Sequence, residues 1–418
     1  MTPGPDTLNL PVLWVVTDQF PYPARNGITL PIFHYLKELG STHSIRLILL
    51  VAHNAAINPS SLADNEALFG EIVQLRLDRK KAVIRAFNEL FCQEMYQHGW
   101  TVNRPVHLAH LPAPQAVLVS PMSAVAKWRA CDGPLLHPGV NHLAAVNDCT
   151  TAEYYFRSQS LGGNQTQRIK HRIDRMRSHW IGVIEKKLLQ PYPFICLQTQ
   201  TDRDLMRRLV GPETADKVVL VPNGVAQSYL SVMPTPGNQV VFVGELSGEY
   251  ANSVHWLVAE VWPQIVIANK SVELLIVGMG ASAKLSHLMR TTERVTHLEY
   301  VADLAAVYAN AMVALSPVFK GFGLINKTLE AMACGLPVVG GLAAFNGLEG
   351  FQTNQHGVVC NERSSTEFVN VLSALISDPD RRSTIGINAR ALIATKFKWA
   401  DTVQRIRKCL KSEETVDA

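Results

Sequence analysis

Short apolar runs alternate with longer segments of helical period along most of the chain. Each run is bounded by turn residues and is apolar at nearly every position, as buried parallel strands are. This alternation is typical of parallel sheets covered by crossover helices, so it predicts a doubly wound α/β fold. In the first half the predicted strands are residues 11–17, 45–51, 72–77, 115–120, 142–147, 194–199 and 217–221.

A break in this rhythm divides the chain. Residues 221–239 contain three prolines and two glycines, and no apolar period continues across them. The strands predicted after the break are residues 240–244, 273–277, 296–301, 312–316 and 337–340, with helices at 251–268 and 303–311. The predicted organisation is an N-terminal Rossmann-like domain at 1–222, a linker at 223–239, a C-terminal Rossmann-like domain at 240–390 and a C-terminal helix at 391–418.

The tail from Ser365 to about Leu410 has a helical pattern and no further strand, and Phe397 and Trp399 give it an apolar face. We expect this tail to return to the first domain. Open α/β sheets bind ligands in the crevice outside the carboxyl ends of their strands. Two facing sheets therefore predict one central cleft that both domains share.

Composition narrows the class of protein. The chain has 418 residues, 47% of them hydrophobic, which is ample for two cores. A net charge of +4 is too small to indicate nucleic-acid binding. The N-terminus has no basic cluster before its apolar run, and no stretch approaches the ~20 apolar residues of a membrane span. We therefore expect a cytoplasmic protein.

Metal binding and disulfide bonds are not indicated. The seven cysteines are scattered, odd in number and never spaced as C-x-x-C, so buried thiols are the better interpretation. Two histidine pairs, His107 with His110 and His137 with His142, lack a neighbouring cysteine or carboxylate that would complete a tetrahedral set. The sequence predicts no metal site and no bound cofactor.

The most informative stretch is SPVFKGFGLINKTLEAMACGLPVVGG at 316–341. A strand ends, a glycine-rich loop follows, and a helix begins near Asn326. Gly321 and Gly323 allow the backbone to approach a ligand and to take positive φ. The loop presents the free N–H groups and positive end of the helix to an anion, and Lys327 adds charge.

Glu330 lies one turn into that helix, about 5 Å along its axis, where it could accept hydrogen bonds from ribose hydroxyls. A purely structural account is also open: a glutamate in a first turn favours the helix dipole, and Gly335 with Pro337 ends a short helix. The loop, lysine and glutamate together favour a phosphate-bearing ligand.

The run GFGLINKTLEAMACGLPVV resembles the donor-binding signature of family 4, or group 1, retaining GT-B glycosyltransferases, in the subgroup that reads G-x-G-x-K-x-K-x-L-E-A-M-A-x-G-x-P-V-V. The likeness extends to residues 18–39, 240–257, 273–280 and 295–317. The resemblance implies the GT-B fold, with two doubly wound Rossmann-like domains facing a central cleft. It also implies a nucleotide-sugar donor, a UDP- or GDP-sugar, and an acceptor that the sequence does not identify.

The same resemblance assigns roles to residues. Glu330 would hold the ribose, and the backbone at Tyr300 and Val301 would border the base. Asn26 and Gly27 would face the diphosphate from the N-terminal domain, although a plain strand-to-helix turn explains them equally well. The diphosphate and sugar would meet a set of loop residues, namely Gly244, Gly321, Phe322, Gly323, Leu324, Asn326 and Lys327.

Some positions depart from the family pattern. Phe322 stands where many members have a glutamate, although the G-x-G subgroup also lacks it. Glu245 and Asn252 stand where an arginine and a lysine commonly grip the donor phosphates. Lys327 would then have to supply that charge alone.

Asp148 falls where the family often has a histidine, at the end of the strand at 142–147. It could hydrogen-bond a sugar hydroxyl or polarise an acceptor hydroxyl. Alternatively, Asn147 and Asp148 cap the next helix together with Thr150 and Thr151. Asp148 and Lys327 are the candidate catalytic residues, and a helix dipole, backbone amides and Lys327 could neutralise the leaving diphosphate without a metal.

A basic amphipathic segment at 168–188 has no place in this chemistry. Ile169, Ile173, Met176, Trp180 and Ile184 share one predicted helical face, flanked by several arginines. Such a helix can lie on an anionic membrane, pack on its own domain or contact an anionic substrate.

Two rival functions stay open. VGMGASA contains G-x-G-x-x-A after a strand, and Glu299 follows about 20 residues later, which formally satisfies a nicotinamide-binding fingerprint. It follows the second strand of its domain, however, and leaves Glu330 unused. The other rival is a GT-B sugar-nucleotide epimerase or a member that binds a nucleotide-sugar without turnover.

Overall fold

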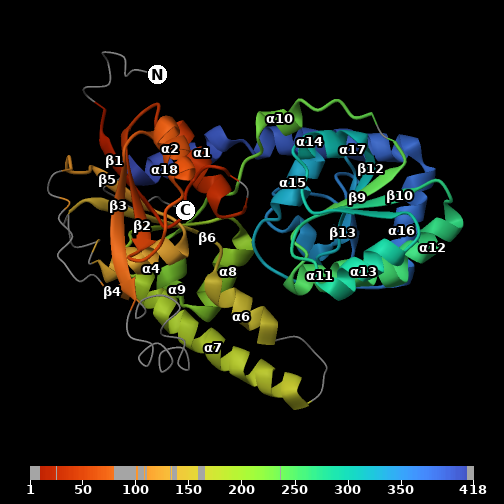
Figure 1. Ribbon diagram of the computed structural model, residues 1–418, viewed down its shortest axis with the longest axis horizontal. Helices are drawn as coiled ribbons and strands as arrows, with labels where there is room; N and C mark the ends of the chain where they lie inside the picture. Colours follow the sequence, from red (N-terminus) through yellow and green to blue (C-terminus); the bar gives the residue numbers. More distant parts are fainter. Residues whose placement is uncertain are drawn as a thin grey trace. The chain divides into compact units, whose positions relative to one another are not determined.

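The computed structural model describes residues 10–24, 26–79, 100–101, 108, 111–131, 133, 139–158, 165–235 and 237–411. The chain forms two compact units, residues 1–222 with 400–418 and residues 223–399 (Figure 1). His107, His110 and His137 lie outside the described residues, and so does Cys92. The other six cysteines are free and buried.

The first unit is built on an eight-stranded sheet of order β4-β3-β2-β1-β5-β6-β7-β8, in which only the β3–β4 pair is antiparallel. The strands are β1 (Val12–Thr17), β2 (Ser44–Ala52), β3 (Ile72–Arg79), β4 (Trp100–Thr101), β5 (Ala116–Val119), β6 (Asn141–Asn147), β7 (Phe194–Leu197) and β8 (Val218–Leu220). Its helices are α1 (Thr29–Leu39), α2 (Pro59–Phe69), α4 (Met122–Ala130), α6 (Thr150–Ser158), α7 (Gln165–Leu189), α8 (Gln200–Leu209) and α9 (Pro212–Ala215).

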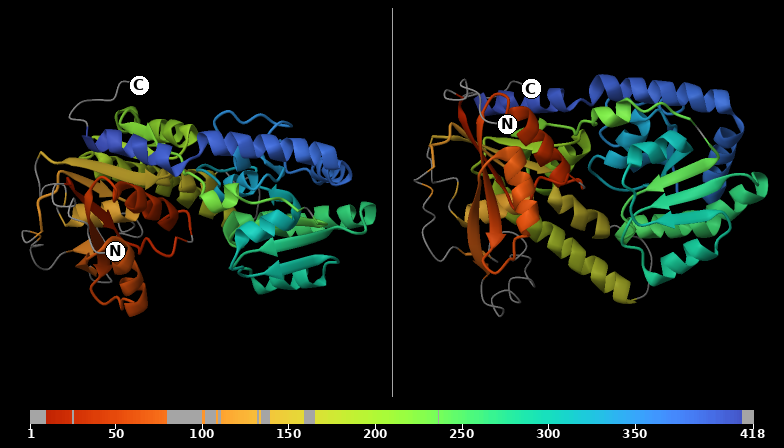
Figure 2. Two further views of the ribbon diagram at one scale, coloured as in Figure 1. Left: turned by 90° about the horizontal axis from the view of Figure 1, so that it is seen from above. Right: turned by 45° about the horizontal axis from the view of Figure 1, so that its top comes forward.

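The second unit is built on a six-stranded parallel sheet of order β11-β10-β9-β12-β13-β14, and helices cover both of its faces (Figure 2). Its strands are β9 (Gln239–Val243), β10 (Glu273–Val277), β11 (Val295–Leu298), β12 (Ala311–Ser316), β13 (Val338–Gly341) and β14 (Val358–Cys360). Its helices are α10 (Gln227–Leu230), α11 (Gly248–Trp256), α12 (Trp262–Ala268), α13 (Ala283–Thr291), α14 (Leu304–Asn310), α15 (Asn326–Ala333), α16 (Ser365–Ser377) and α17 (Pro379–Lys396).

Both sheets confirm the doubly wound α/β prediction, and each reverses its strand order once. The reversal lies between β1 and β5 in the first unit and between β9 and β12 in the second. Parallel strands bring their carboxyl ends to one edge, and a crevice opens there where the order reverses. The loops after β9 and β12 therefore flank the expected ligand position in the second unit.

Residues 223–235 and 237–239, most of the predicted linker, pack onto the second unit. Asn223 is fully buried, and Val225 N–H donates to the Phe397 carbonyl at 3.0 Å. After Trp399 the chain returns to the first unit, where it forms α18 (Trp399–Lys411). Asn141 Nδ2 donates to the Cys409 carbonyl at 2.6 Å, which holds α18 on this unit. The predicted boundary at 390/391 falls inside α17, which is continuous to Lys396.

Two local predictions were wrong in detail, and the short strands β4 and β14 were not predicted. The strand expected at 296–301 ends at Leu298, because the following residues form the loop to α14. The helix expected at 251–268 is α11 and α12 joined by a π-helical turn at Leu257–Val261. The three-residue strand β14 was missed, because so short a run carries no periodic signal.

Candidate functional site

The loop between β12 and α15 is anchored at both ends. Ser316, the last residue of β12, is buried, and its hydroxyl accepts a hydrogen bond from the Thr328 hydroxyl at 3.0 Å. The Val318 amide donates to the Ser316 carbonyl at 2.7 Å. The first turns of α15 are therefore fixed to the end of the strand, which sets where the helix N-terminus lies.

Glycines allow the close packing of this loop. A Cβ at Gly340 would come within 2.5 Å of the Ser316 carbonyl oxygen, and one at Gly341 within 2.4 Å of the Val318 carbonyl oxygen. Gly323 has φ 77°, in the left-handed region that favours glycine. The loop conformation thus depends on glycine at three positions.

The N-terminus of α15 is open to an anion. Its N-cap residue is Ile325, whose side chain cannot accept a hydrogen bond from the first-turn amides. Asn326 Oδ1 instead accepts from Nδ2 of the buried Asn223 at 2.9 Å. By contrast, the hydroxyl of Ser282 caps α13 by accepting from the Leu285 amide. Uncapped amides and the positive helix end favour a phosphate at α15.

Glu330 is nearly buried and already has polar partners. Lys327 Nζ donates to its two carboxylate oxygens at 2.8 and 3.1 Å, and the Tyr229 hydroxyl donates a further hydrogen bond. Burial raises the pKa of Glu330, while Lys327 and Tyr229 act in the opposite direction. Ribose hydroxyls would therefore replace or share the Lys327 contact, which would free this ammonium group for the phosphates.

Two further cations lie at this edge of the sheet, and the sequence analysis missed both. Lys320 immediately precedes Gly321 and is exposed. Arg363 follows β14 and reaches α11, where its guanidinium lies 3.5 Å from the Glu249 carboxylate and donates to the Asn252 carbonyl at 2.6 Å. Of these two cations, only Lys320 could have been predicted from the sequence, because it lies beside a glycine of the loop.

The remaining predicted donor residues of the second unit also follow carboxyl ends of strands. Gly244 follows β9, and its carbonyl oxygen lies 1.8 Å from the position of a Cβ at Gly278. Tyr300 and Val301 follow β11; Tyr300 is 63% exposed, whereas Val301 is partly buried against the core. Leu324 is a buried core side chain, so only its backbone could meet a ligand.

The rival nicotinamide fingerprint has a structural explanation. Gly278 belongs to it, and its lack of a Cβ allows β9 and β10 to end in close contact. The loop after β10 does not lie at the reversal of strand order, where a dinucleotide-binding loop is found. Glu299 is exposed in the loop beyond β11.

In the first unit, Asn26 caps the helix that follows it. Its Oδ1 accepts from the amides of Ile28 and Thr29 at 2.9 and 2.8 Å, and Gly27 is exposed beside it. This geometry favours the turn interpretation of Asn26. Across the strand reversal, Lys127 Nζ lies 2.8 Å from the Asp18 carboxylate, so Asp18 serves in an ion pair.

Asp148 lies directly after the carboxyl end of β6, and the capping alternative for it is wrong. The amides of Thr150 and Thr151 donate to the buried carboxylate of Glu185 instead. Asp148 is partly exposed, but its Oδ1 is buried and has no hydrogen-bond partner. Burial, with a smaller contribution from Asp202, raises the pKa of Asp148 to about 8. This shift favours the protonated carboxyl group, which donates a hydrogen bond, over the carboxylate, which could act as a base.

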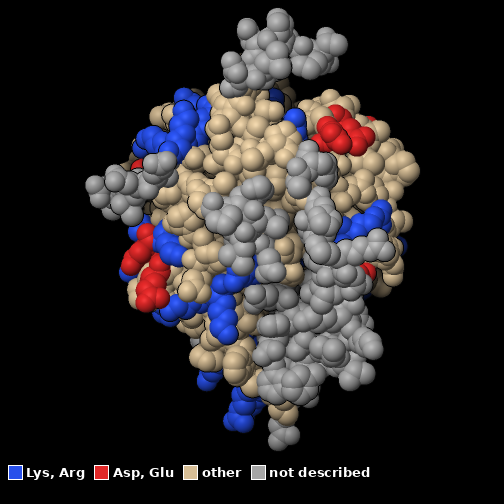
Figure 3. All heavy atoms as spheres, turned by 90° about the vertical axis from the view of Figure 1, so that its left-hand side faces the viewer, with Lys and Arg blue, Asp and Glu red and all other residues tan. Residues whose placement is uncertain are grey.

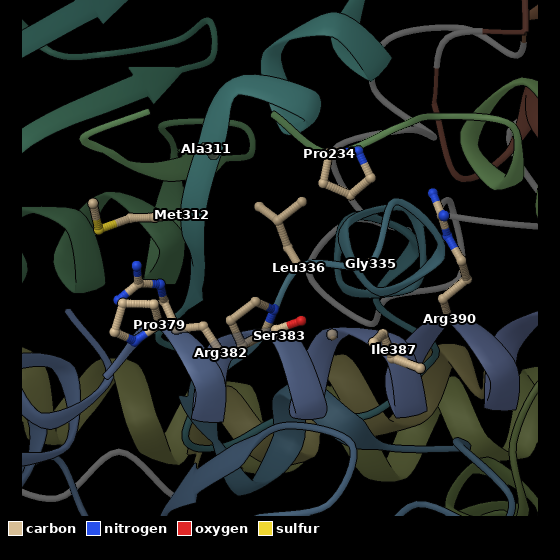
Figure 4. Close-up of a pocket in the computed structure, with 12 residues that line it drawn as sticks. Pro234, Ala311, Met312, Gly335, Leu336, Pro379, Arg382, Ser383, Ile387 and Arg390 are labelled. Atoms are coloured by element: carbon tan, nitrogen blue, oxygen red, sulfur yellow. The ribbon is translucent and has the colours of Figure 1, made fainter. Parts of the chain in front are cut away.

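A separate cavity of about 330 Å³ lies at the opposite edge of the second sheet (Figure 4). Met312, Leu336 and Ile387 give it apolar walls, and Arg382 and Arg390 border it. Both arginines already donate to backbone carbonyls at helix ends. This cavity therefore lies apart from the candidate site and offers no unused charge.

Comparison with known proteins shows a family resemblance in the second unit. Residues 237–378, which include β9 to α16, match the model of the family described as "Glycosyl transferases group 1". Over these residues the chain is similar to the group 1 glycosyl transferases. The match covers the glycine-rich loop, Lys327 and Glu330, so the loop predicted from the sequence lies within the family's own domain.

Curated proteins that are similar to this chain align with it over part of their length. The chain is 28% identical over 163 residues to a GDP-mannose-dependent monoacylated alpha-(1-6)-phosphatidylinositol monomannoside mannosyltransferase of Corynebacterium glutamicum, covering 36% of this chain and 42% of that one. It is 26% identical over 239 residues to glycogen synthase of Mycobacterium tuberculosis, covering 53% and 55%. The chain thus spans about half the length of the relatives it matches.

Solved structures align over almost the whole chain. HepE of Anabaena, in complex with UDP and glucose, aligns with a TM-score of 0.66 at 15% identity, over 97% of this chain and 100% of that chain. Sucrose-phosphate synthase of Thermosynechococcus elongatus aligns with a TM-score of 0.62 at 16% identity, over 96% and 98%. These alignments confirm the GT-B fold.

The positions that depart from the family pattern have local partners. The Glu245 carboxylate accepts from the Ser247 hydroxyl at 2.8 Å, and Asn252 Nδ2 donates to Glu249 at 3.1 Å. Glu245 follows β9, whereas Asn252 lies in α11 and its carbonyl accepts a hydrogen bond from Arg363. A positive charge reaches this region from Arg363, which follows β14 and is paired with Glu249.

Proposed function

We propose that the protein transfers a hexose-type sugar from a nucleoside-diphosphate sugar to an acceptor hydroxyl, with retention of configuration and without a metal. The observation that carries the proposal is the open N-terminus of α15 beside the strand reversal, one turn before the buried Glu330. The open helix N-terminus can bind a diphosphate, and the Glu330 carboxylate can accept hydrogen bonds from ribose hydroxyls.

In the proposed complex, donor phosphates lie against the backbone amides from Gly323 to Lys327. The ribose hydroxyls donate to Glu330, and the released Lys327 ammonium group turns toward the diphosphate. Lys320 lies in the same loop and adds charge. As the bond from the anomeric carbon to the leaving oxygen breaks, these groups stabilise the negative charge that develops on the diphosphate.

The first unit would supply the acceptor side. The raised pKa of Asp148 favours its protonated form, which would donate a hydrogen bond to a sugar or acceptor oxygen. That Asn26 and Gly27 lie near the diphosphate is still a prediction. The Asn26 side chain already accepts a hydrogen bond from the Ile28 amide. Reaction in the cytoplasm likewise stays a prediction.

Relatives suggest the class of donor. One is described as GDP-mannose-dependent, and one structural neighbour was solved with UDP and glucose. UDP- and GDP-sugars are therefore the first donors to screen, followed by dTDP-sugars. Because a ligand that binds the folded state raises its melting temperature, thermal shift identifies the donor before any acceptor is known.

The activity test follows release of nucleoside diphosphate from each stabilising donor, with water or added sugars as acceptor. Turnover supports the proposal. Binding without release from any donor would identify a binding protein and contradict the transferase.

Two variants test the donor site. Hydrogen bonds to charged groups contribute about 1.5–3 kcal/mol, so Glu330→Ala and Lys327→Ala should each weaken donor binding roughly 10- to 100-fold in calorimetry. The exposed Glu293→Ala serves as the matched control. Unchanged affinity in the Glu330 variant would remove the proposed ribose contact.

A further inference from the structure

Helix α7 is fixed to the first unit by one face only. The residues of this inner face are buried, among them Asp174, Ser178, Ile181 and Leu188. Glu185 on the same face binds the first amides of α6, and Ser178 donates to the Thr151 carbonyl at 3.4 Å. These contacts define which side of the 25-residue helix faces away from its unit.

The outer face of α7 carries an apolar stripe. Its members are Ile169, Ile173, Met176, Trp180 and Val183, with exposed fractions of 59%, 40%, 46%, 37% and 37%. Their spacing of four, three, four and three residues places them on one line along the helix. Ile184, which was predicted on this face, is buried on the inner side. As the alternative of packing on its own domain predicted, α7 packs on its unit with Arg168, Arg172 and Arg175 exposed, but it does so through the inner face and leaves this stripe exposed.

Positive charge lines this stripe. Arg168, Arg172 and Arg175 are exposed along one flank, and Lys187 is exposed near the end of the helix. The acidic residues of α7, Asp174 and Glu185, are both buried. Figure 3, which views the side that lies to the left in Figure 1, shows blue basic groups and no red acidic ones in its lowest described part. The outer surface is thus apolar and cationic.

We propose that the outer stripe of α7 docks on an anionic lipid surface. The apolar side chains would enter the boundary between headgroups and acyl chains, and the arginines would contact lipid phosphates. Trp180 suits this interface because its ring is amphipathic. This docking is independent of the proposed donor chemistry.

A second copy of the chain fits this surface less well. Pairing two outer stripes would bring two basic flanks together, and α7 exposes no carboxylate to balance them. An anionic membrane supplies both the apolar depth and the negative charge. The described residues include no helix long and apolar enough to cross a membrane, so the contact is peripheral.

The test is cosedimentation of the full chain with vesicles of phosphatidylcholine alone or with phosphatidylglycerol. We expect binding only to the anionic vesicles, and a decrease at high salt. Arg172→Ala with Arg175→Ala should reduce the partition coefficient on the order of 25-fold at low salt, about fivefold for each charge. Ile173→Ser with Met176→Ser should reduce it at least tenfold, because apolar burial is lost.

Control variants lie in the second unit. Ile267→Ser removes an apolar side chain that is 78% exposed, more than either stripe residue, and Lys284→Glu changes an exposed charge; both variants should bind like the unaltered protein. Melting temperatures of all variants should agree, because the altered side chains are exposed. Protein that stays in the supernatant with anionic vesicles overturns the proposal. So does equal binding to neutral vesicles, or dimerisation that the Ile173 and Met176 changes abolish.

Discussion

Replacing Asp148 by asparagine tests whether its carboxyl group holds a proton in the folded protein. Asparagine has the shape of the neutral acid but does not titrate. Burial and Asp202 raise the pKa from 3.8 to about 8, so the folded protein retains this proton where the unfolded chain has lost it. The resulting contribution to stability is complete below pH 4 and is lost as the pH rises through 8.

The size of the change in stability follows from the pH interval between the unfolded and folded pKa values of Asp148. Between pH 4 and 8 the unaltered protein should lose about 1.4 kcal/mol per pH unit relative to Asp148→Asn. For a unit of this size, 1 kcal/mol corresponds to about 2–4 °C in melting temperature. The difference in melting temperature between the two proteins should therefore change by roughly 4 °C per pH unit.

Differential scanning calorimetry at pH 5, 6 and 7 measures this difference. Burial also raises the pKa of Glu185, but both proteins contain that group, so its effect cancels. Asp204→Asn, which changes an exposed carboxylate on α8, is the control. If the melting-temperature difference between Asp148→Asn and the unaltered protein is constant from pH 5 to 7, the raised pKa is wrong.

Two further predictions concern the second unit. Gly278→Ala places a Cβ 1.8 Å from the Gly244 carbonyl oxygen, so it should lower the melting temperature by several degrees or prevent folding; an unchanged melting curve would contradict this packing. Asn223→Ala removes the buried partner of Asn326 and should destabilise the unit by about 1–3 kcal/mol in urea unfolding. The exposed Asn238→Ala should have a smaller effect, and equal effects would refute the reasoning.

Strands and the donor loop could be predicted because their signals are local. Buried parallel strands are apolar throughout, and glycines beside a strand end mark a close turn; β10 was predicted to the residue. The start of α15 at Asn326 was also correct. The short strand β14 gave no such signal. Because β14 was not predicted, the sequence did not indicate that Arg363 follows the end of a strand.

Partners distant in sequence could not be predicted. Glu185 lies 34 residues after Thr151, yet it takes the capping role that Asn147 and Asp148 were considered for. Tyr229 reaches Glu330 from a segment predicted to be a linker. Periodicity predicts which face of an element is buried, but it does not show which buried polar groups will meet.

The account rests on phosphate binding at the start of α15. The most direct measurement is a crystal structure with the nucleoside diphosphate that gives the largest thermal shift. We predict phosphate oxygens against the amides of residues 323–327, ribose hydroxyls on Glu330, and Lys327 moved from its 2.8 Å contact with that carboxylate. Nucleotide bound elsewhere, for example at the loop after β10 with the α15 terminus empty, would contradict the account.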